Sequence, residues 1–260
     1  LVSTVHCLYS VYAYSAIMAR GEEVIAISEC VESYIKAHYR VQPDRLTLVH
    51  RGLDPDAFRH GRVTPEWRQA LLNDYPVLDG KRIILMPGRL TRWKGQEAFL
   101  LMMSALVELR PDCHGVVIGG AEAAKSHYQD ELLELRARLG LEQAVTFVGH
   151  RSDIATFYEF AAVTCHMSNK AEPFGRTVPE SLAVGTPVVA FDRGGASESL
   201  KPAFPRGLVP ADDIEEFARR VADLLDEAPS ITLPADFLLD AQVEKTLAVY
   251  RRLLARKAAR

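Results

Sequence analysis

The sequence predicts an α/β protein with a parallel, doubly wound sheet, and three observations lead to this class. Short β-branched segments alternate with longer helical segments along the chain. The strand-like segments are apolar at successive positions, as expected when both faces of a sheet are covered. Apolar residues make up 48% of the 260 residues and charged residues 25%, which is enough for a buried core and too apolar for a disordered chain.

The strands expected from this pattern are short and rich in β-branched residues. They are Val2–Val5, Val24–Ile27, Leu46–Val49, Ile83–Met86, Gly115–Ile118, Val145–Val148, Ala162–Cys165 and Pro187–Ala190. The expected helices are longer and carry apolar residues at helical spacing. They are Glu29–His38, Gln96–Leu109, Tyr128–Leu139, Asp153–Phe160, Val178–Val184, Ile214–Leu225 and Ala235–Arg260. The last of them has an apolar side formed by Leu238, Leu239, Val243, Leu247, Tyr250 and Leu254.

Signals at helix ends support two of these helices. Ser28 precedes the helix that begins at Glu29, and its hydroxyl can accept a backbone hydrogen bond as an N-cap. Gly140 follows Arg138 and Leu139, as in a helix that ends on a basic turn and a glycine.

A lapse in the periodic pattern divides the chain. Pro55, Gly61 and Pro65 fall close together around residues 54–64, and we expect a domain boundary there. Residues 1–50 carry too few strands for an independent doubly wound domain, and the chain starts at Leu1. We therefore expect residues 1–50 to be part of a truncated N-terminal domain. Residues 51–234 would form a complete domain and residues 235–260 a separate C-terminal helix.

Charge and cysteine content exclude several classes of protein. Lysine plus arginine is 31 and aspartate plus glutamate is 34, so the formal net charge is −3, which argues against nucleic acid as a partner. Cys7, Cys30, Cys113 and Cys165 have no metal-ligand spacing, so we expect free core thiols in a reducing compartment. No segment has the roughly 18 apolar residues that span a bilayer, and no signal-peptide pattern is seen. These features favour a cytoplasmic protein.

The first candidate site is the loop Gly88–Gly95 (GRLTRWKG), between an expected strand and an expected helix. Ligands of open α/β sheets bind beyond the carboxyl ends of the strands. Its three cations suit a diphosphate, because arginine can donate two hydrogen bonds and lysine adds a compact charge. A solvated basic loop is the alternative, and spacing alone favours it. No GxGxxG motif occurs, and the nearest sequence, Val117–Ala121 (VIGGA), is a weak match.

The second candidate site is Glu172–Glu180 (EPFGRTVPE), in which two carboxylates flank a loop that turns into a helix. Thr177 with Glu180 fits a capping box, so a structural role for Glu180 stays open. Eight helical residues span about 12 Å, more than the roughly 5–9.5 Å between the carboxyl groups of glycosidases. Carboxylates on both sides of a helix N-terminus instead suit the hydroxyls on both sides of a phosphate. This arrangement predicts a nucleotide sugar as ligand.

Two further candidates are weaker. Phe147–Asp153 (FVGHRSD) is a strand end that can present backbone groups to a nucleobase. It is equally a plain loop with Ser152 or Asp153 as a helix cap. His6 ends the first strand, where a lone histidine is more often structural, although the carboxyl end of a strand is a functional position.

Taken in order, these motifs resemble the retaining glycosyltransferases of family 4, which have the GT-B fold of two Rossmann-like domains. The resemblance covers nearly the whole chain and is more specific than any single motif. Its motifs are Val24–Ser28, Val49–Asp54 with Phe58, Gly88–Gly95, Phe147–His150, Glu172 with Glu180, Gly185–Ala190, and Gly194 and Gly195 with Glu198. It implies a complete C-terminal donor-binding domain, a partial N-terminal domain, and a last helix that crosses back to the N-terminal domain.

The resemblance implies a role for each matching residue. Arg89 and Lys94 hold the donor diphosphate and stabilise the leaving group as charge develops. Glu172 binds the sugar hydroxyls, and His6 approaches the donor sugar, which completes the implied catalytic set. The implied donor-binding residues are Gly88, Val148, His150, Arg151, Phe174, Gly175, Arg176, Thr177, Val178 and Glu180. Of these, Glu180 binds the ribose, residues 148–151 border the base, and residues 174–178 offer backbone amides to sugar and phosphate.

The resemblance also implies the reaction. Transfer retains the anomeric configuration by a front-face or ion-pair route and needs no bound metal, and no Asp-x-Asp motif occurs. The donor is a UDP- or GDP-sugar that serves as substrate, so no cofactor is expected. The closest similarity is to enzymes of the bacterial envelope, which implies a glycan or glycolipid acceptor such as a lipopolysaccharide precursor. Peripheral association with the inner membrane then accompanies a cytoplasmic location.

Two other functions stay open. A truncated chain can be a non-catalytic module that binds a nucleotide sugar, because the N-terminal domain carries most of the acceptor site in the family. A nicotinamide-dependent oxidoreductase fits the α/β pattern but not the absence of GxGxxG.

Overall fold

The computed structural model describes residues 1–12, 15–120, 126–227 and 229–259. Its strands are β1 (Val2–Val5), β2 (Glu23–Ala26), β3 (Leu46–Leu48), β4 (Arg82–Pro87), β5 (Cys113–Ile118), β6 (Val145–Gly149), β7 (Val163–His166), β8 (Val188–Phe191) and β9 (Leu208–Val209). Within this part of the chain they form a three-stranded sheet, β1-β2-β3, and a six-stranded sheet, β6-β5-β4-β7-β8-β9. All pairings are parallel, which confirms the expected fold class.

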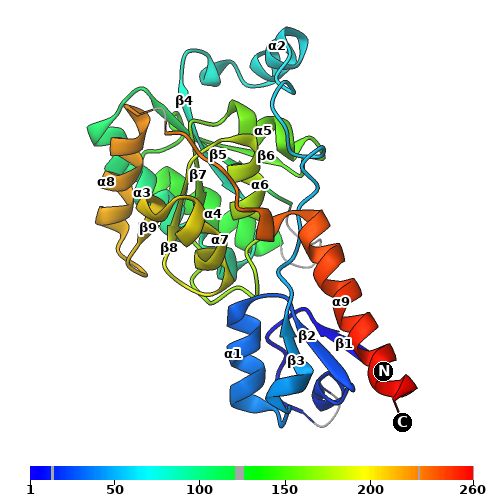
Figure 1. Cartoon of the computed structure of the whole chain (residues 1–260). Coiled ribbons are helices and arrows are strands. Elements are labelled where there is room, and N and C mark those ends of the chain that lie inside the picture. The colour runs from blue at the N-terminus through cyan, green and yellow to red at the C-terminus, as the bar shows by residue number, and fades with distance from the viewer. Residues whose placement is uncertain (13–14, 121–125, 228, 260) are drawn as a thin grey trace.

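The helices follow the strands in chain order. They are α1 (Glu29–His38), α2 (Pro65–Asp74), α3 (Gln96–Leu109), α4 (Ser126–Arg138), α5 (Ile154–Phe160), α6 (Thr177–Val184), α7 (Gly195–Ala203), α8 (Ile214–Leu225) and α9 (Leu239–Ala258). On the six-stranded sheet, α3 packs between α4 and α8, and α6 packs between α5 and α7. Figure 1 shows this large unit above a small unit made of β1–β3 and α1, with α9 alongside the small unit.

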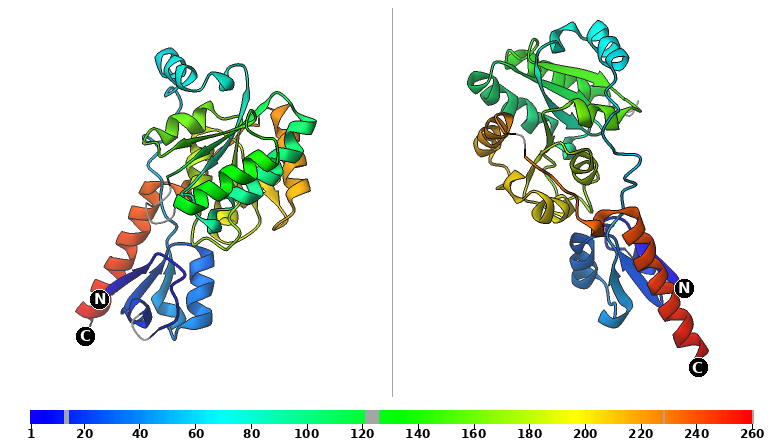
Figure 2. Two further views of the ribbon diagram at one scale, coloured as in Figure 1. Left: turned by 180° about the vertical axis from the view of Figure 1, so that it is seen from behind. Right: turned by 45° about the horizontal axis from the view of Figure 1, so that its top comes forward.

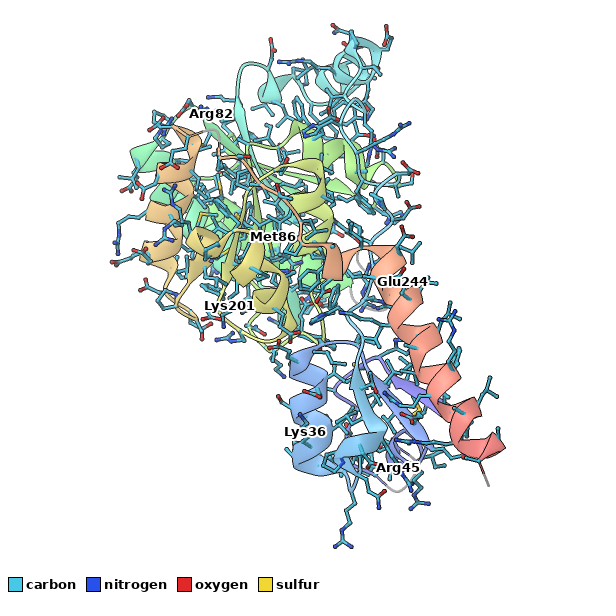
Figure 3. All side chains as sticks on the ribbon, viewed as in Figure 1. Lys36, Arg45, Arg82, Met86, Lys201 and Glu244 are labelled. Carbon is cyan, nitrogen blue, oxygen red and sulfur yellow. The ribbon has the colours of Figure 1, made fainter. Side chains whose placement is uncertain are left out.

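Strand β4 shows why the strands of the large unit are apolar throughout. Successive side chains of a strand point to opposite faces. Ile84 and Met86 therefore belong to the core beneath α3, whereas Ile83 and Leu85 belong to the core beneath α5. All four are at most 2% exposed, and burial of each contributes about 1.5–3 kcal/mol. Figure 3 places Met86 inside the large unit, while Lys36 and Arg45 lie on the outside of the small unit.

All the expected strands and helices are present, with ends shifted by a few residues, and three elements were not expected. Strand β9 is two residues long and follows a 3₁₀ turn, so it has no detectable periodicity. Helix α7 begins with Gly195 and contains Pro202, and both residues suggest a loop. Helix α2 begins at Pro65, with Thr64 accepting a hydrogen bond from the Trp67 amide; a cap followed by proline is a start signal, but the helix was not predicted.

Both expected helix-end signals are confirmed. The Ser28 hydroxyl accepts a hydrogen bond from the amide of Val31 at 3.0 Å, as an N-cap of α1. Gly140 has a φ of +66°, and the Leu141 amide donates to the carbonyl of Arg136. This is the pattern of a helix end that needs a left-handed residue.

The C-terminal segment lies against the small unit. A 3₁₀ turn, Ala235–Phe237, precedes α9, so the regular helix starts four residues later than expected, and Arg260 lies outside the described residues. Glu23 of β2, fully buried, pairs with Arg252 at 2.5 Å and Arg256 at 2.8 Å. In both views of Figure 2, α9 runs along the small unit and the two chain ends lie close together.

The apolar side of α9 faces solvent. Its exposed residues are Leu239, Val243, Leu247, Tyr250 and Leu254. The inner side of the helix is fixed instead by Val249, which is 1% exposed, and by the two arginines that pair with Glu23. Among the described residues, no helix combines the length and apolar character needed to cross a membrane.

The cysteines fulfil the expectation only in part. All four are free, but Cys7 and Cys30 are partly exposed, and only Cys113 and Cys165 are buried. The expectation of core positions is therefore wrong for Cys7 and Cys30, which lie in a loop and on the first turn of α1. Burial raises the pKa of Cys113 to about 11, so this thiol stays protonated at neutral pH.

Candidate functional site

The candidate residues lie where the strands of the large sheet end. Parallel strands place all their carboxyl ends at one edge, and the loops after β4, β6 and β7 carry residues 88–95, 150–153 and 167–176. This edge faces the small unit (Figure 1). The sheet therefore gathers segments that are far apart in the sequence.

The loop after β4 is held by close backbone contacts that only glycine permits. Gly88 has a φ of +151°, and a Cβ on Gly119 would lie 1.8 Å from the carbonyl oxygen of Gly88. Gly95 has a φ of +82°, and its Cβ would lie 1.9 Å from the carbonyl oxygen of Met167. The second contact presses this loop against the loop after β7, and Lys94 is thereby brought next to Glu172.

The three cations of this loop diverge. Lys94 points to the loop after β7, whereas Arg92 donates to Glu97 and Glu131 on the side of α3 and α4. The Arg89 side chain is exposed, and its backbone carbonyl accepts a hydrogen bond from Gln96 at 3.0 Å. Arg92 thus turns away from Lys94, toward α3 and α4.

Lys94 and Glu172 form the centre of a buried polar cluster. The Lys94 ammonium lies 2.7 Å from Glu172 Oε1, and the Glu172 side chain is 9% exposed. The hydroxyl of Ser168 also donates to Glu172, and His166 Nε2 lies 3.4 Å away. Burial would raise the pKa of Glu172, but His166, Lys94 and Ser168 outweigh it, and the pKa is lowered. The site therefore holds an ionised carboxylate beside an ammonium group.

The start of α6 contradicts the capping-box alternative. The Thr177 hydroxyl contacts His166 Nδ1 at 2.9 Å, and no side chain caps the helix at Arg176. Glu180 accepts a hydrogen bond from Tyr158 at 3.0 Å and pairs with Arg176 at 2.9 Å. The capping box fails because both side chains find tertiary partners. Burial raises the pKa of Glu180, and Arg176 and Tyr158 oppose this only in part.

One of the backbone amides expected to bind phosphate at the start of α6 already has a partner. The amide of Val178 donates to the carbonyl of Gly175 at 3.0 Å, so it is not available to a phosphate as expected. Gly175 has a φ of +77°, and a Cβ there would lie 2.8 Å from the Cβ of Ala196. Phe174 is 4% exposed and packs against Phe237 of the C-terminal segment.

The loop after β6 shows a mixed result. Val148 is buried and His150 is exposed. Arg151 donates to Asp153 at 2.8 and 2.9 Å. Asp153 occupies the N-cap position of α5 but makes no side-chain cap, and it accepts a further hydrogen bond from Trp67. The capping alternative for Asp153 is therefore wrong in its contacts.

His6 follows β1 of the small unit and is exposed. Partial burial, and next the charge of Arg51, lower its pKa. Arg51 lines a cavity of about 150 Å³ together with Phe174 and Arg176. The structure thus brings the loop that follows the small sheet up to the start of α6.

Two polar residues around the site, His166 and Ser168, were not predicted, and Glu198 was named only as part of a motif, without a role. His166 and Ser168 surround Glu172, and their signal was a polar ending on an otherwise apolar strand. Glu198 of α7 accepts hydrogen bonds from the amides of Glu29 and Cys30 at 2.7 and 2.6 Å. It thereby joins the large unit to the first turn of α1.

A larger cavity, of about 1010 Å³, lies beside this junction, between α1, α7 and the turn before α9. Its lining includes Glu198, His50 and Ala171, the residue before Glu172, but not Lys94 or Glu172 themselves. Across the described ranges, no group of three or more His, Cys, Asp or Glu side chains is placed to hold a metal ion.

Comparison with known proteins adds three findings. Residues 68–236, more than half of the chain, match the family described as "Glycosyl transferases group 1". The lipopolysaccharide core biosynthesis mannosyltransferase LpsB of Rhizobium meliloti is 27% identical over 249 residues, which is 92% of this chain and 68% of that protein. A D-inositol 3-phosphate glycosyltransferase of Streptomyces scabiei is 29% identical over 219 residues, which is 81% of this chain and 47% of that protein. The chain thus spans between about half and two thirds of these relatives.

A solved structure shares the fold. Anabaena HepE, solved in complex with UDP and glucose, superposes with a TM-score of 0.75 at 23% identity, over 99% of this chain and 71% of HepE.

Proposed function

The chain belongs to the glycosyl transferases group 1 family, and from that premise we propose that it moves a sugar from a nucleotide-sugar donor to a glycan or glycolipid acceptor. The finer proposal is transfer of the family 4 type, with retention of configuration and without a metal ion. One observation carries it. The ion pair of Lys94 and Glu172 lies at the carboxyl edge of the sheet, next to the start of α6. That combination suits a diphosphate bonded to a polyhydroxylated group.

The diphosphate is bound by cations and a helix N-terminus. Lys94 has three N–H donors, so it can contact Glu172 and a phosphate together. Arg89 adds a guanidinium from the same loop, and the backbone amides of Arg176 and Thr177 lie at the positive end of α6. As the bond to the sugar breaks, negative charge grows on the leaving diphosphate, and these groups stabilise it. This is their catalytic role in the proposal.

The sugar and the nucleoside occupy the two sides of this anion site. Glu172, ionised, accepts hydrogen bonds from sugar hydroxyls, with the amides of Phe174 and Gly175 beside it. His6 faces the sugar from the small unit. Glu180 accepts from the ribose hydroxyls. Gly88 allows close approach of the backbone, and Val148, His150 and Arg151 border the base.

The printed names of the relatives guide the choice of substrates. LpsB is a mannosyltransferase of lipopolysaccharide core biosynthesis, and HepE was solved with UDP and glucose. We propose a UDP- or GDP-sugar as donor and a lipopolysaccharide precursor as acceptor. We also propose a cytoplasmic location with peripheral association at the inner membrane, where such an acceptor would be presented.

The proposal divides the chain into residues 1–50 on the acceptor side, residues 51–234 as the donor-binding domain, and residues 235–260 as the helix that crosses back. The chain spans 68% of LpsB and 47% of the Streptomyces relative. Donor binding and sugar transfer are therefore proposed, and tested, separately. A donor-binding module without transfer is the second candidate, and the three-stranded small sheet favours it.

Titration calorimetry with UDP, GDP, UDP-glucose and GDP-mannose tests the binding claim. Lys94→Ala and Arg89→Ala each remove charge-assisted hydrogen bonds of about 1.5–3 kcal/mol, so affinity should fall about 10- to 100-fold. Arg92→Ala is the matched control, because Arg92 lies in the same loop but pairs with Glu97 and Glu131. Equal affinity in all three variants and the parent would contradict the anion site.

Turnover distinguishes the two candidates. Transfer of sugar from the donor in the presence of EDTA supports metal-independent transfer. A product that NMR shows to have the anomeric configuration of the donor supports retention. Tight donor binding with neither hydrolysis nor transfer supports the module instead.

A further inference from the structure

His166, the last residue of β7, contacts two parts of the site and has no role in the proposed function so far. Its Nε2 lies 3.4 Å from Glu172 Oε1, and its Nδ1 lies 2.9 Å from the Thr177 hydroxyl. The ring is 7% exposed. Its two partners come from the loop after β7 and from the first turn of α6, so one side chain joins both segments.

The state of the ring determines the direction of these contacts. Burial lowers the pKa of His166, and this favours the neutral ring; Glu172 opposes the shift and Lys94 adds to it. A neutral imidazole has one N–H donor and one acceptor. Because the ionised Glu172 can only accept, the proton fits best on Nε2, and Nδ1 then accepts from Thr177. The Thr177 hydroxyl thus donates to His166, and the N–H of His166 points to Glu172.

The two partners serve different parts of the ligand. Glu172 is proposed to bind the sugar hydroxyls, whereas Thr177 sits at the helix start proposed to bind the diphosphate. We propose that His166 is a positioning residue that fixes Glu172 relative to the start of α6, so that the donor sugar adds to the affinity of the diphosphate. This inference rests on the proposed function.

Ligand binding makes this role larger. A diphosphate attracts the Lys94 ammonium, which in the free protein lies 2.7 Å from Glu172. Once Lys94 is shared with phosphate, its hold on the carboxylate weakens. Ser168 and His166 then remain as neighbours of Glu172, and of these two only His166 also contacts α6. The orientation of Glu172 toward the sugar therefore depends on the imidazole.

Two substitutions separate the two contacts. The amide of an asparagine lies close to the position of Nδ1, and the amide of a glutamine reaches the position of Nε2. His166→Asn should keep the contact with Thr177 and lose the one with Glu172, and His166→Gln should do the reverse. A residue that merely fills space would give the same loss in both variants.

The readout is the ratio of the dissociation constant of UDP to that of UDP-glucose, or of GDP to GDP-mannose if the chain binds that pair. In His166→Asn, the nucleoside diphosphate should bind as in the parent, and the extra affinity supplied by the sugar should fall about 10-fold. In His166→Gln, both ligands should weaken together by about 3- to 10-fold, and their ratio should change less than in His166→Asn. Each factor of 10 corresponds to about 1.4 kcal/mol.

His114 provides a matched control. It is also a buried histidine, and its Nε2 lies 2.8 Å from the hydroxyl of Thr146 within the same sheet. His114→Asn and His114→Gln should lower the melting temperature without changing either ratio. Thr177→Val removes the hydroxyl but keeps the backbone amide, and it should reproduce the effect of His166→Gln even if the His166 variants fail to fold.

The outcomes distinguish this inference from the proposed function. A parent chain that binds no nucleotide overturns the proposed function and the inference with it. A parent that binds UDP and UDP-glucose with equal affinity, and likewise GDP and GDP-mannose, overturns the inference, as does an unchanged ratio in His166→Asn. Neither of these two results contradicts the proposed binding of the diphosphate.

Discussion

The two units of the molecule are stabilised in different ways. The large unit is covered by helices on both faces of its sheet, and the central strands β4 and β5 are buried almost throughout. In the small unit, β1 and β3 are mostly half-buried. Its sheet is joined to α9, more than 200 residues away in sequence, by the pairs of Glu23 with Arg252 and Arg256. The small unit therefore combines a small apolar core with a buried carboxylate that is paired with α9.

The same difference in packing bears on the location of the proposed site. The rigid edge of the large sheet carries Lys94 and Glu172, whose partners are fixed by backbone contacts at Gly95. The small unit contributes the exposed His6 and the nearby Arg51. The groups of the proposed site that need fixed geometry therefore lie on the better packed unit.

The largest expected effect is the loss of stability caused by Glu23→Ala, which should be confined to the small unit and α9. Glu23→Ala removes the charge-assisted hydrogen bonds from Arg252 and Arg256, each worth about 1.5–3 kcal/mol, and should destabilise the small unit by about 3–5 kcal/mol. Hydrogen exchange measured by mass spectrometry should show faster exchange in β1–β3 and α9, with β4 and β5 unchanged.

The neighbouring Glu22→Ala is the control for this variant. The Glu22 side chain is 43% exposed and pairs with Lys257 and the N-terminus, so its loss should have little effect on exchange. Equal effects of the two substitutions would show that burial of Glu23 is not what matters.

The second prediction is that the stability of the large unit falls at acidic pH because of His114. Burial lowers the pKa of His114 from 6.5 to about 4. Between these values the unfolded chain binds a proton that the folded chain does not, so stability falls as pH decreases from about 6.5 to about 4. The loss of stability is at most about 3.5 kcal/mol, at about 1.4 kcal/mol per pH unit.

Urea unfolding of the parent and of His114→Gln across this pH range tests the prediction. The variant should lose less stability than the parent on acidification. Parallel curves would show that His114 does not contribute, and a larger loss in the variant would contradict the sign.

The smallest expected effect is the loss of stability on removing a helix cap, and it can be compared between α1 and α2. Ser28→Ala removes the cap of α1 and a hydrogen bond to the carbonyl of Pro173 in the large unit. Thr64→Ala removes the cap of α2, where the hydroxyl accepts from Trp67 at 3.2 Å. Each loss should cost about 1 kcal/mol. Exchange should increase in α1 for Ser28→Ala and only in α2 for Thr64→Ala, and a reversed pattern would contradict the assignment.

Local signals explain what could be predicted and what could not. Ser28 and Gly140 were read correctly because a helix end depends on residues within one turn. The capping box of Thr177 and Glu180 satisfied the same local rule and was wrong, because His166 and Tyr158 supply tertiary partners. The amide of Val178 was expected to be available and bonds Gly175 instead. Glu198 was noticed as part of a motif, but its contact with Glu29 joins residues 169 positions apart.

The sequence by itself determined the α/β class, the course of most strands and helices, and the loops in which polar residues follow apolar strands. Periodicity and strand ends are local properties, so composition and spacing are enough to predict them. Only the tertiary structure decided that Lys94 meets Glu172 while Arg92 turns to Glu131, that His166 joins Glu172 to Thr177, and that α9 completes the small unit. Such contacts join segments whose separation in space depends on how the sheets pack, and on the left-handed glycines that let the loops approach each other.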